Sequence, residues 1–328
     1  MLLQMKTSQH NHFSFRPDIS DKVARLTQSR IGENRVGDSL SLSWRDSSVQ
    51  YVLLGISESI GPQANHGRSG SEKAFDAFLS VFSNMQLTSN FKIETIAIAG
   101  EITCEIPFTN VEEARNWVVE LDKFVTEILQ PIIEQGKIPI IIGGGHNNAF
   151  PIIQAFAQNN KSLAVINMDA HADCRALEGR HSGNPFSYAL DRKLLLSYGV
   201  FGLHKAYNNE QSIHFLIENN VKFGYFDEYV FNLDQFFVDV KAYLSTVSRG
   251  NFVGVELDLD CMANVPSSAM SPIGFTINDA RKYIRECLLS QQVGYFHFPE
   301  GAVIQVGDDR IVGRILAQFV FDILSFQK

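Results

Sequence analysis

Three short polar clusters in this sequence have residue types and spacings that suit metal binding. The stretch 167–175, NMDAHADCR, places Asp169, His171 and Asp173 two residues apart, directly after the apolar run SLAVI. Side chains two apart on an extended chain point to one face, so the three could converge on one point. Two carboxylates and an imidazole gathered there would repel or desolvate one another unless a cation compensated them. A solvated loop after a strand is the alternative; three such residues in register favour metal.

Two further clusters follow other apolar runs. Asp258 and Asp260 end the segment VELDLD, with Glu256 at the same parity one step deeper in the strand. A half-exposed strand with its acidic face in water would explain this segment equally well if it stood alone. His146 follows three glycines, which let the backbone approach a ligand closely. Such glycine-rich turns are common, so this cluster is informative only beside the other two.

Together the clusters offer more negative charge than one divalent cation needs, and they suit two. Carboxylate oxygens with a minority of imidazoles favour manganese or magnesium-like ions, and zinc, cobalt or nickel stay open as alternatives. Two ions about 3.5–4 Å apart can share a bridging water and lower its pKa enough to form hydroxide near neutral pH. We therefore predict metal-assisted hydrolysis at a site built from His146, Asp169, His171, Asp173, Asp258 and Asp260.

The elements that would position these clusters alternate along the chain. Between the predicted strands lie helical patterns at 111–136 and 276–290, the second opening on Thr276 with Asp279 three residues on, a capping arrangement. This alternation predicts βαβ crossovers, a mainly parallel sheet and ligands at the carboxyl ends of its strands. The predicted strands cover 50–57, 94–99, 138–143, 162–168, 197–203, 252–260 and 293–298. We expect an irregular N-terminal arm over 1–45 and a single α/β domain over 46–328.

Composition limits the class of protein. The chain has 328 residues, 45% of them hydrophobic and 20% charged, with a formal net charge of −8. That charge argues against nucleic acid or an anionic membrane as the main partner. The four cysteines contain no CxxC pair, and no run of 18 apolar residues occurs, so we expect a soluble cytoplasmic protein with reduced thiols and no membrane span. A small-molecule substrate is the expected partner, and self-association into a homo-oligomer is left open.

Taken in order, these clusters resemble the signature of the ureohydrolases, the family of arginases, agmatinases and formimidoylglutamases. GGGHNN is similar to its GG-x-H block, DAHAD to its D-A-H-x-D block and ELDLD to its x-x-D-x-D block, while GPQANHGRSG resembles an early G-R-x-G loop. The resemblance runs from about residue 48 to the C-terminus. It implies a three-layer α/β/α arginase-like fold and a pair of manganese ions as cofactor.

The resemblance also implies how the ligands divide. One ion would take His146, Asp169, Asp173 and Asp258, and the other Asp169, His171, Asp258 and Asp260, with Asp169 and Asp258 bridging. A hydroxide between the ions would attack an sp² carbon bonded to nitrogen. Glu300, at the end of YFHFPE, stands where the family has a glutamate that holds the substrate's amidinium or guanidinium; a surface acid in a loop is its alternative.

Departures from the arginase pattern suggest the substrate. Tyr207 stands where arginases carry an acid for the α-amino group, and Arg175 replaces an asparagine, bringing a side chain that can bind a carboxylate through two hydrogen bonds. A salt bridge from Arg175 to Glu178 would explain this arginine equally well, and Arg68 and Lys205 are lesser candidates for the carboxylate. The segment RHSGNPF at 180–186 is closer to formimidoylglutamases than to arginases, which favours Asn184 as a substrate contact.

The same segment suggests a proton carrier. The shuttle histidine of arginases would align with Ser182, so we expect His181, one position away, to take over, unless another group does. The predicted reaction is hydrolysis of N-formimidoyl-L-glutamate to L-glutamate and formamide, as in histidine breakdown. An arginase or another guanidino-compound hydrolase such as an agmatinase is the nearest alternative. A catalytically silent relative acting as a binding protein, or a deacetylase-type hydrolase with one zinc ion, are more distant ones.

Overall fold

A computed structural model describes residues 12–89, 91–290 and 292–326. Within these residues nine strands form one sheet in the order β1-β3-β2-β4-β9-β8-β5-β6-β7. Only β1 runs antiparallel to its neighbour, β3, and every other described pairing is parallel. The strands are β1 (Phe13–Arg16), β2 (Tyr51–Ser57), β3 (Ile96–Cys104), β4 (Ile138–Ile142), β5 (Leu163–Met168), β6 (Ser197–Leu203), β7 (Lys222–Tyr225), β8 (Phe252–Leu257) and β9 (Gln292–Phe298).

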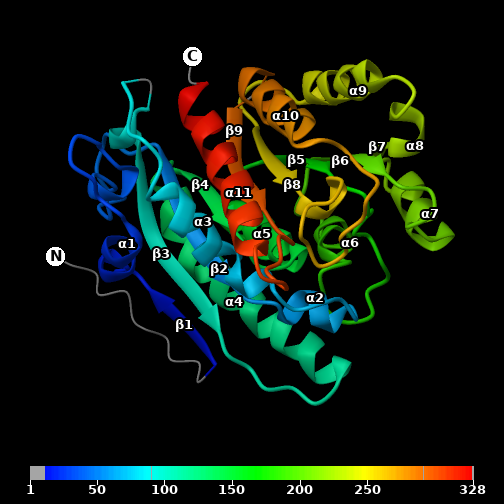
Figure 1. The fold of residues 1–328 in the computed structure, drawn as a ribbon. Coiled ribbons are helices and arrows are strands. Elements are labelled where there is room, and N and C mark those ends of the chain that lie inside the picture. The colour runs from blue at the N-terminus through cyan, green and yellow to red at the C-terminus, as the bar shows by residue number, and fades with distance from the viewer. Residues whose placement is uncertain (1–11, 90, 291, 327–328) are drawn as a thin grey trace.

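Helices cover both faces of the sheet (Figure 1). The helices on the first face are α1 (Ser20–Leu26), α3 (Ala74–Phe82), α8 (Phe226–Tyr229), α9 (Leu233–Thr246), α10 (Ile277–Ser290) and α11 (Asp308–Ser325). Those on the second face are α2 (Ile60–Ala64), α4 (Val111–Glu134), α5 (Ala149–Gln158), α6 (Pro185–Asp191) and α7 (Glu210–Glu218). Short 3₁₀ turns lie at η1 (Val36–Asp38), η2 (Ser71–Lys73), η3 (Ile93–Thr95), η4 (His146–Asn148) and η5 (Leu259–Cys261). The predicted three-layer α/β/α architecture with a mainly parallel sheet is confirmed.

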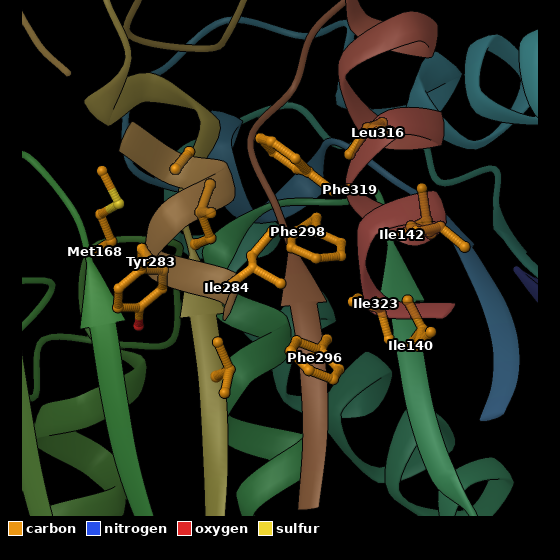
Figure 2. Close-up of a cluster of buried hydrophobic side chains, with 14 of the residues drawn as sticks. Ile140, Ile142, Met168, Tyr283, Ile284, Phe296, Phe298, Leu316, Phe319 and Ile323 are labelled. Atoms are coloured by element: carbon orange, nitrogen blue, oxygen red, sulfur yellow. The ribbon is translucent and has the colours of Figure 1, made fainter. Parts of the chain in front are cut away.

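The alternation of side chains along each strand supplies both cores. In β2, Tyr51 and Leu53 belong to the core under α3 and α11, whereas Val52 and Leu54 belong to the core under α4 and α5. Because both faces are covered, the central strands are apolar almost throughout, as parallel strands usually are. Figure 2 shows part of the first core, in which Phe296 and Phe298 of β9 lie beside side chains of α11 such as Phe319. The sheet therefore packs between two apolar layers, and polar residues lie at the carboxyl ends of its central strands.

The observed elements differ from the sequence predictions at several points. Helix α10 begins as expected, with Thr276 Oγ1 accepting from the Asp279 amide at 3.2 Å. The strands β1 and β7 were not predicted, because each has four residues and a mixed burial pattern. Strand β8 ends at Leu257 rather than at residue 260, since Asp258 caps the turn η5.

The N-terminal region has more regular structure than an arm. Within residues 1–45, expected to be irregular, β1 forms one edge of the sheet by pairing with β3, and α1 packs against the first core. Residues 1–11 lie outside the described part of the chain. The division into an arm and one domain at residue 46 stays a prediction. Among the described helices, none combines the length and the apolar character needed to cross a bilayer.

The contact between α11 and the sheet makes a stability prediction. The Phe319 ring is fully buried, with its centroid 5.5 Å from that of Phe298. Phe319→Ala should lower the free energy of unfolding by about 3–5 kcal/mol, because it removes buried apolar surface and leaves a cavity. Phe231, which is 90% exposed, supplies the matched control, and Phe231→Ala should change stability by less than about 0.5 kcal/mol. Equal unfolding midpoints in urea for the two variants would contradict this packing.

Candidate metal centre

The predicted ligands follow three strands near the middle of the sheet. His146 opens η4 after β4, Asp169 follows β5, and Asp258 follows β8. The strand order places β4, β9, β8 and β5 side by side, so their carboxyl ends meet at one stretch of the sheet edge. Glu300 follows β9 and completes this row. Segments more than 100 residues apart in the chain thus meet because of the crossover topology.

The first group of candidate ligands surrounds the ring of His146. Its Nδ1 lies 2.9 Å from Asp173 Oδ2, 3.0 Å from Asp258 Oδ2 and 3.2 Å from Asp169 Oδ2. Three carboxylates thus converge on one imidazole nitrogen, although Nδ1 forms no hydrogen bond of acceptable geometry. The group agrees with the set expected for one ion.

The second group lies closer to solvent. His171 Nδ1 is 3.2 Å from Asp260 Oδ2 and 3.7 Å from Asp169 Oδ1, and these three residues could hold another ion. Asp169 therefore belongs to both groups, one oxygen facing each histidine. Asp258 lies with the first group only, and its Oδ1 accepts a 2.8 Å hydrogen bond from the Asp260 amide. Its bridging role stays a prediction, whereas the position of Asp169 suits a bridge.

The chemistry of this donor set fits divalent cations. Burial, and next the charge of Asp169, raise the pKa of Asp173 to about 6. Burial also raises the pKa of Asp258, with further increases from Asp260 and Asp169. Asp260 Oδ1 is buried and has no hydrogen-bond partner. Crowded carboxylates that resist ionisation and a buried unpaired oxygen are the features that a bound cation would relieve.

The segment 169–175 brings its side chains together through a turn, not through the strand alternation expected from the sequence. Residues 169–175 are not an extension of β5, so strict alternation does not explain why their side chains converge. Instead the chain turns, with Asp173 at φ +45°, in the left-handed region that a non-glycine residue seldom adopts. The Asp169 Oδ1 atom accepts from the His171 amide at 2.7 Å, and Asn167 donates to Oδ2 at 2.9 Å. The turn is therefore held by the candidate ligands themselves.

A buried carboxylate that the sequence did not single out holds the glycine-rich turn. Glu58, after β2, accepts hydrogen bonds from the amides of Gly145 and Gly61 and from the Asn148 side chain, at 2.7–3.1 Å. It thereby fixes the residue that precedes His146. Asn208 holds the turn between His171 and Asp173, because its Oδ1 accepts a hydrogen bond from the Ala172 amide at 2.7 Å. Neither residue belongs to a recognisable motif, so sequence reasoning had no signal for them.

Above the ligands lies a cavity of about 220 Å³. His171, Asp173, Asp258 and Asp260 form its floor with Glu300, while amides, hydroxyls, the imidazole of His66 and one arginine, Arg175, contribute to its walls. Arg68 and Lys205, the lesser candidates for binding a carboxylate, are not among the described residues that line the cavity. Lys205 instead pairs with Glu228 at 3.0 Å on the surface.

Glu300 lies at the cavity floor with a constrained backbone. Its φ is +66°, its Oε1 accepts from the His146 amide at 2.7 Å, and its Oε2 accepts from Ser268 Oγ. Burial raises its pKa to about 8, above the ordinary value for a glutamate. The alternative of a surface acid is therefore excluded, because Glu300 is buried beside a candidate ligand.

Arg175 forms the expected salt bridge with Glu178 and also lines the cavity, and its role in binding a carboxylate stays a prediction. Its side chain is 47% exposed and lines the cavity, while Nη2 lies 3.4 Å from Glu178 Oε1. The same Glu178 oxygen is 3.3 Å from Arg115 and 3.2 Å from His181 Nε2. Arg175 contacts this oxygen through Nη2 only. Because a guanidinium has five N–H donors, Arg175 keeps donors for an incoming anion.

His181 and Asn184 lie away from the cavity. Asn184 is fully buried, and its Oδ1 accepts from Arg180 and from the His181 amide while its Nδ2 donates to the carbonyls of Ala176 and Gly179. The His181 ring is buried between Glu178 and the Gly183 amide. Both side chains thus stabilise the loop 175–184, and neither is among the described residues lining the cavity. The geometry gives no support to the predicted substrate and proton-shuttle roles.

A buried ion pair anchors this loop and was missed from the sequence. Arg180 Nε lies 2.9 Å from Asp122 Oδ2 of α4, and Arg180 Nη2 donates to the Asn147 carbonyl at 2.9 Å. The guanidinium also packs on Phe150, 4.7 Å from the ring centroid. The available signal was Asp122 itself, an acid on the apolar face of an amphipathic helix.

Comparison with known proteins gives consistent matches. The model of the Arginase family matches residues 49–300. Formimidoylglutamase of Staphylococcus haemolyticus is 31% identical over 180 residues, 54% of this chain and 54% of that protein, so the match spans about half of each. Formimidoylglutamase of Rhodococcus opacus is 26% identical over 237 residues, 69% of each chain.

Solved structures share the fold. The formimidoylglutamase of Bacillus subtilis matches with a TM-score of 0.74 and 17% identity, over 92% of this chain and 94% of that one. Trypanosoma cruzi formiminoglutamase with Mn²⁺ matches with a TM-score of 0.69 and 19% identity, over 90% and 98% of the two chains. Proclavaminate amidino hydrolase of Streptomyces clavuligerus matches with a TM-score of 0.67 and 18% identity, over 85% and 93%. At these identities the matches establish the arginase-like fold.

The environment of His181 makes a pH prediction. Burial, and next the charge of Arg115, lower the pKa of His181 to about 4. The unfolded value is near 6.5, so the unfolded chain binds more protons between these values and stability is lost as the pH falls from about 6.5 to about 4. An NMR titration of the folded protein should find His181 neutral at pH 6. A pKa at or above 6.5 would contradict this and would restore His181 as a proton carrier.

Proposed function

Because the chain belongs to the arginase family, we propose that it is a binuclear-metal hydrolase of a linear amidine, N-formimidoyl-L-glutamate, yielding L-glutamate and formamide. One observation carries the choice of substrate. Apart from the candidate ligands and Glu300, the described residues that line the cavity include no acid, and they include one arginine. The proposed substrate has two carboxylates and no ammonium group. Arginine and agmatine carry an ammonium that would lack a carboxylate partner on these walls.

The metals belong to the proposal as well. Manganese is named for the Trypanosoma cruzi formiminoglutamase structure, and the hard oxygen ligands here favour the same ion. His146, Asp169, Asp173 and Asp258 would hold one ion, and Asp169, His171 and Asp260 the other. The family resemblance adds Asp258 to the second set, as a bridging ligand. A bound pair would supply the nucleophile, by lowering the pKa of a water held between the two ions.

The chain's own residues would position the substrate. Glu300 forms part of the cavity floor, where an approaching amidinium would favour the ionised form of its carboxyl group. The hydrogen bonds from His146 and Ser268 fix the orientation of this group. Arg175 on the wall would bind a substrate carboxylate through its remaining donors. Tyr207, which stacks on His204 with centroids 4.7 Å apart, lines the cavity and stands where the arginase pattern has an ammonium-binding acid. The two ends of the substrate are thus recognised by groups of opposite charge.

A guanidino-compound hydrolase is the second candidate. Its supporting observation is the likeness to proclavaminate amidino hydrolase, which shares the fold at a similar level. The retention of all six candidate ligands argues against a catalytically silent protein. A deacetylase-type enzyme with one zinc ion would leave the second ligand group without a role. The cytoplasmic location and a homo-oligomeric state stay predictions.

A substrate panel tests the proposal directly. Purified protein loaded with Mn²⁺ should release formamide and glutamate from N-formimidoyl-L-glutamate, with little urea from arginine or agmatine. Urea from arginine without turnover of formimidoylglutamate would favour the guanidino alternative. Bound metal with no hydrolysis of any amidine would favour a catalytically silent protein. A single bound ion per chain would favour a deacetylase-type enzyme.

The first group of ligands makes a mutational prediction. Asp258→Asn should lower kcat by at least about 100-fold, because it removes a charged ligand from a site where the metals supply the nucleophile. Metal analysis should show fewer than two manganese ions per chain in this variant. Wild-type turnover by Asp258→Asn would contradict the two-metal assignment.

Arg175 makes a separate prediction about binding. Arg175→Ala should raise KM for formimidoylglutamate by roughly 10–100-fold, the effect of about 1.5–3 kcal/mol for hydrogen bonds to a charged group, while kcat changes less. Lys205→Ala is the matched control, because Lys205 is a cation on a nearby loop that pairs with Glu228 instead of lining the cavity. Similar KM values for both variants would show that Arg175 serves only its salt bridge with Glu178.

A further inference from the structure

A second buried cluster lies behind His146, on the side away from the other candidate ligands. Glu256 of β8 is paired in register with His297 of β9, and both side chains are fully buried. Glu256 Oε2 lies 2.6 Å from His297 Nδ1, and Oε1 accepts a 2.6 Å hydrogen bond from the Tyr295 hydroxyl. His146 Nε2 faces the same Oε2 atom at 3.4 Å, a close contact without the geometry of a hydrogen bond. One carboxylate is therefore the common partner of two histidines and a tyrosine.

The two nitrogens of the His146 ring point to different surroundings. Nδ1 faces Asp169, Asp173 and Asp258, whereas Nε2 faces Glu256. An imidazole that binds a metal through one nitrogen keeps its proton on the other, and a carboxylate beside that proton fixes the tautomer and the ring orientation. Glu256 is in turn held by partners on β9, so its position does not depend on the loops that carry the other ligands.

We infer that Glu256 is a positioning residue for His146: it holds the proton on Nε2 and presents the Nδ1 lone pair to the first metal ion, while Tyr295 and His297 fix the carboxylate. This rests on the proposed function, in which His146 is a ligand. It assigns a role to the one acid of VELDLD that the ligand sets leave out. It also explains how a fully buried carboxylate is tolerated, since charged and polar groups surround it on three sides.

The variants that test this inference come with a matched control. Glu256→Gln keeps the shape and removes the charge, and Tyr295→Phe removes one hydrogen bond to the carboxylate. Tyr283→Phe is the control, because Tyr283 is an equally buried tyrosine whose hydroxyl donates to the backbone carbonyls of Ile166 and Glu256, each at 3.1 Å, and not to the carboxylate. Tyr295→Phe carries the test if Glu256→Gln fails to fold.

Two readouts are used. Mn²⁺ binding is measured from the electron paramagnetic resonance signal of free Mn²⁺, and the thermal unfolding midpoint is measured with and without Mn²⁺. Glu256→Gln should weaken one of the two sites by about 10–100-fold, Tyr295→Phe should weaken the same site less, and Tyr283→Phe should bind as wild type. The rise in midpoint caused by Mn²⁺ should shrink in the same order. This second readout separates positioning of a ligand from a general loss of stability, which would also lower the midpoint of the metal-free protein.

Two outcomes would overturn the inference alone, and a third would overturn the proposed function on which it rests. Wild-type Mn²⁺ affinity in both Glu256→Gln and Tyr295→Phe, with wild-type protein binding two ions, would refute the role of Glu256 alone. A third ion in the wild type that is lost in Glu256→Gln would make Glu256, His297 and His146 Nε2 ligands themselves. Absence of Mn²⁺ binding by the wild type would instead refute the proposed function.

Discussion

The structure depends on one electrostatic constraint, the crowding of four aspartates and two histidines into a mostly buried space at the edge of the sheet. Asp169, Asp173 and Asp258 all approach the Nδ1 atom of His146 within 3.2 Å. In a medium of low dielectric constant such carboxylates oppose one another's ionisation, and the pKa of Asp173 and that of Asp258 are both raised. Two divalent cations would bind these carboxylates and offset their mutual repulsion. The aspartates would then all be ionised only when the metal ions are bound.

The fold meets this constraint by distributing the ligands over rigid elements. Adjacent central strands end at the same edge, so each contributes one short polar segment without a long loop. Buried carboxylates lie behind the segments: Glu58 accepts from the amide of Gly145, just before His146, and Glu256 lies 3.4 Å from Nε2 of the His146 ring. Part of the cavity wall is built differently, from the loop 175–184, whose position depends on the buried pair of Arg180 and Asp122. The candidate ligands thus follow rigid strands, whereas this part of the wall is a loop.

The sequence predicted the parts of this arrangement that follow from periodicity. Seven of the nine strands in the described residues, the parallel topology and the convergence of the six candidate ligands all follow from apolar runs that end in acids or histidine. It could not predict residues whose role depends on a distant partner, such as Asp122 with Arg180. For the same reason it could not show that His181 and Asn184 form hydrogen bonds within the loop 175–184, and their substrate and proton-shuttle roles stay predictions. Strand parity also gave an incomplete explanation for Asp173, whose left-handed backbone brings it into the site.

The central claim is that one buried cluster holds two metal ions that share Asp169. Crystals of the protein grown with Mn²⁺, with diffraction measured on either side of the manganese absorption edge, would test it most directly. The account predicts two anomalous peaks about 3.5–4 Å apart, one beside His146 and the other beside His171, with Asp169 between them. A single peak beside His146, or none at this edge of the sheet, would contradict it.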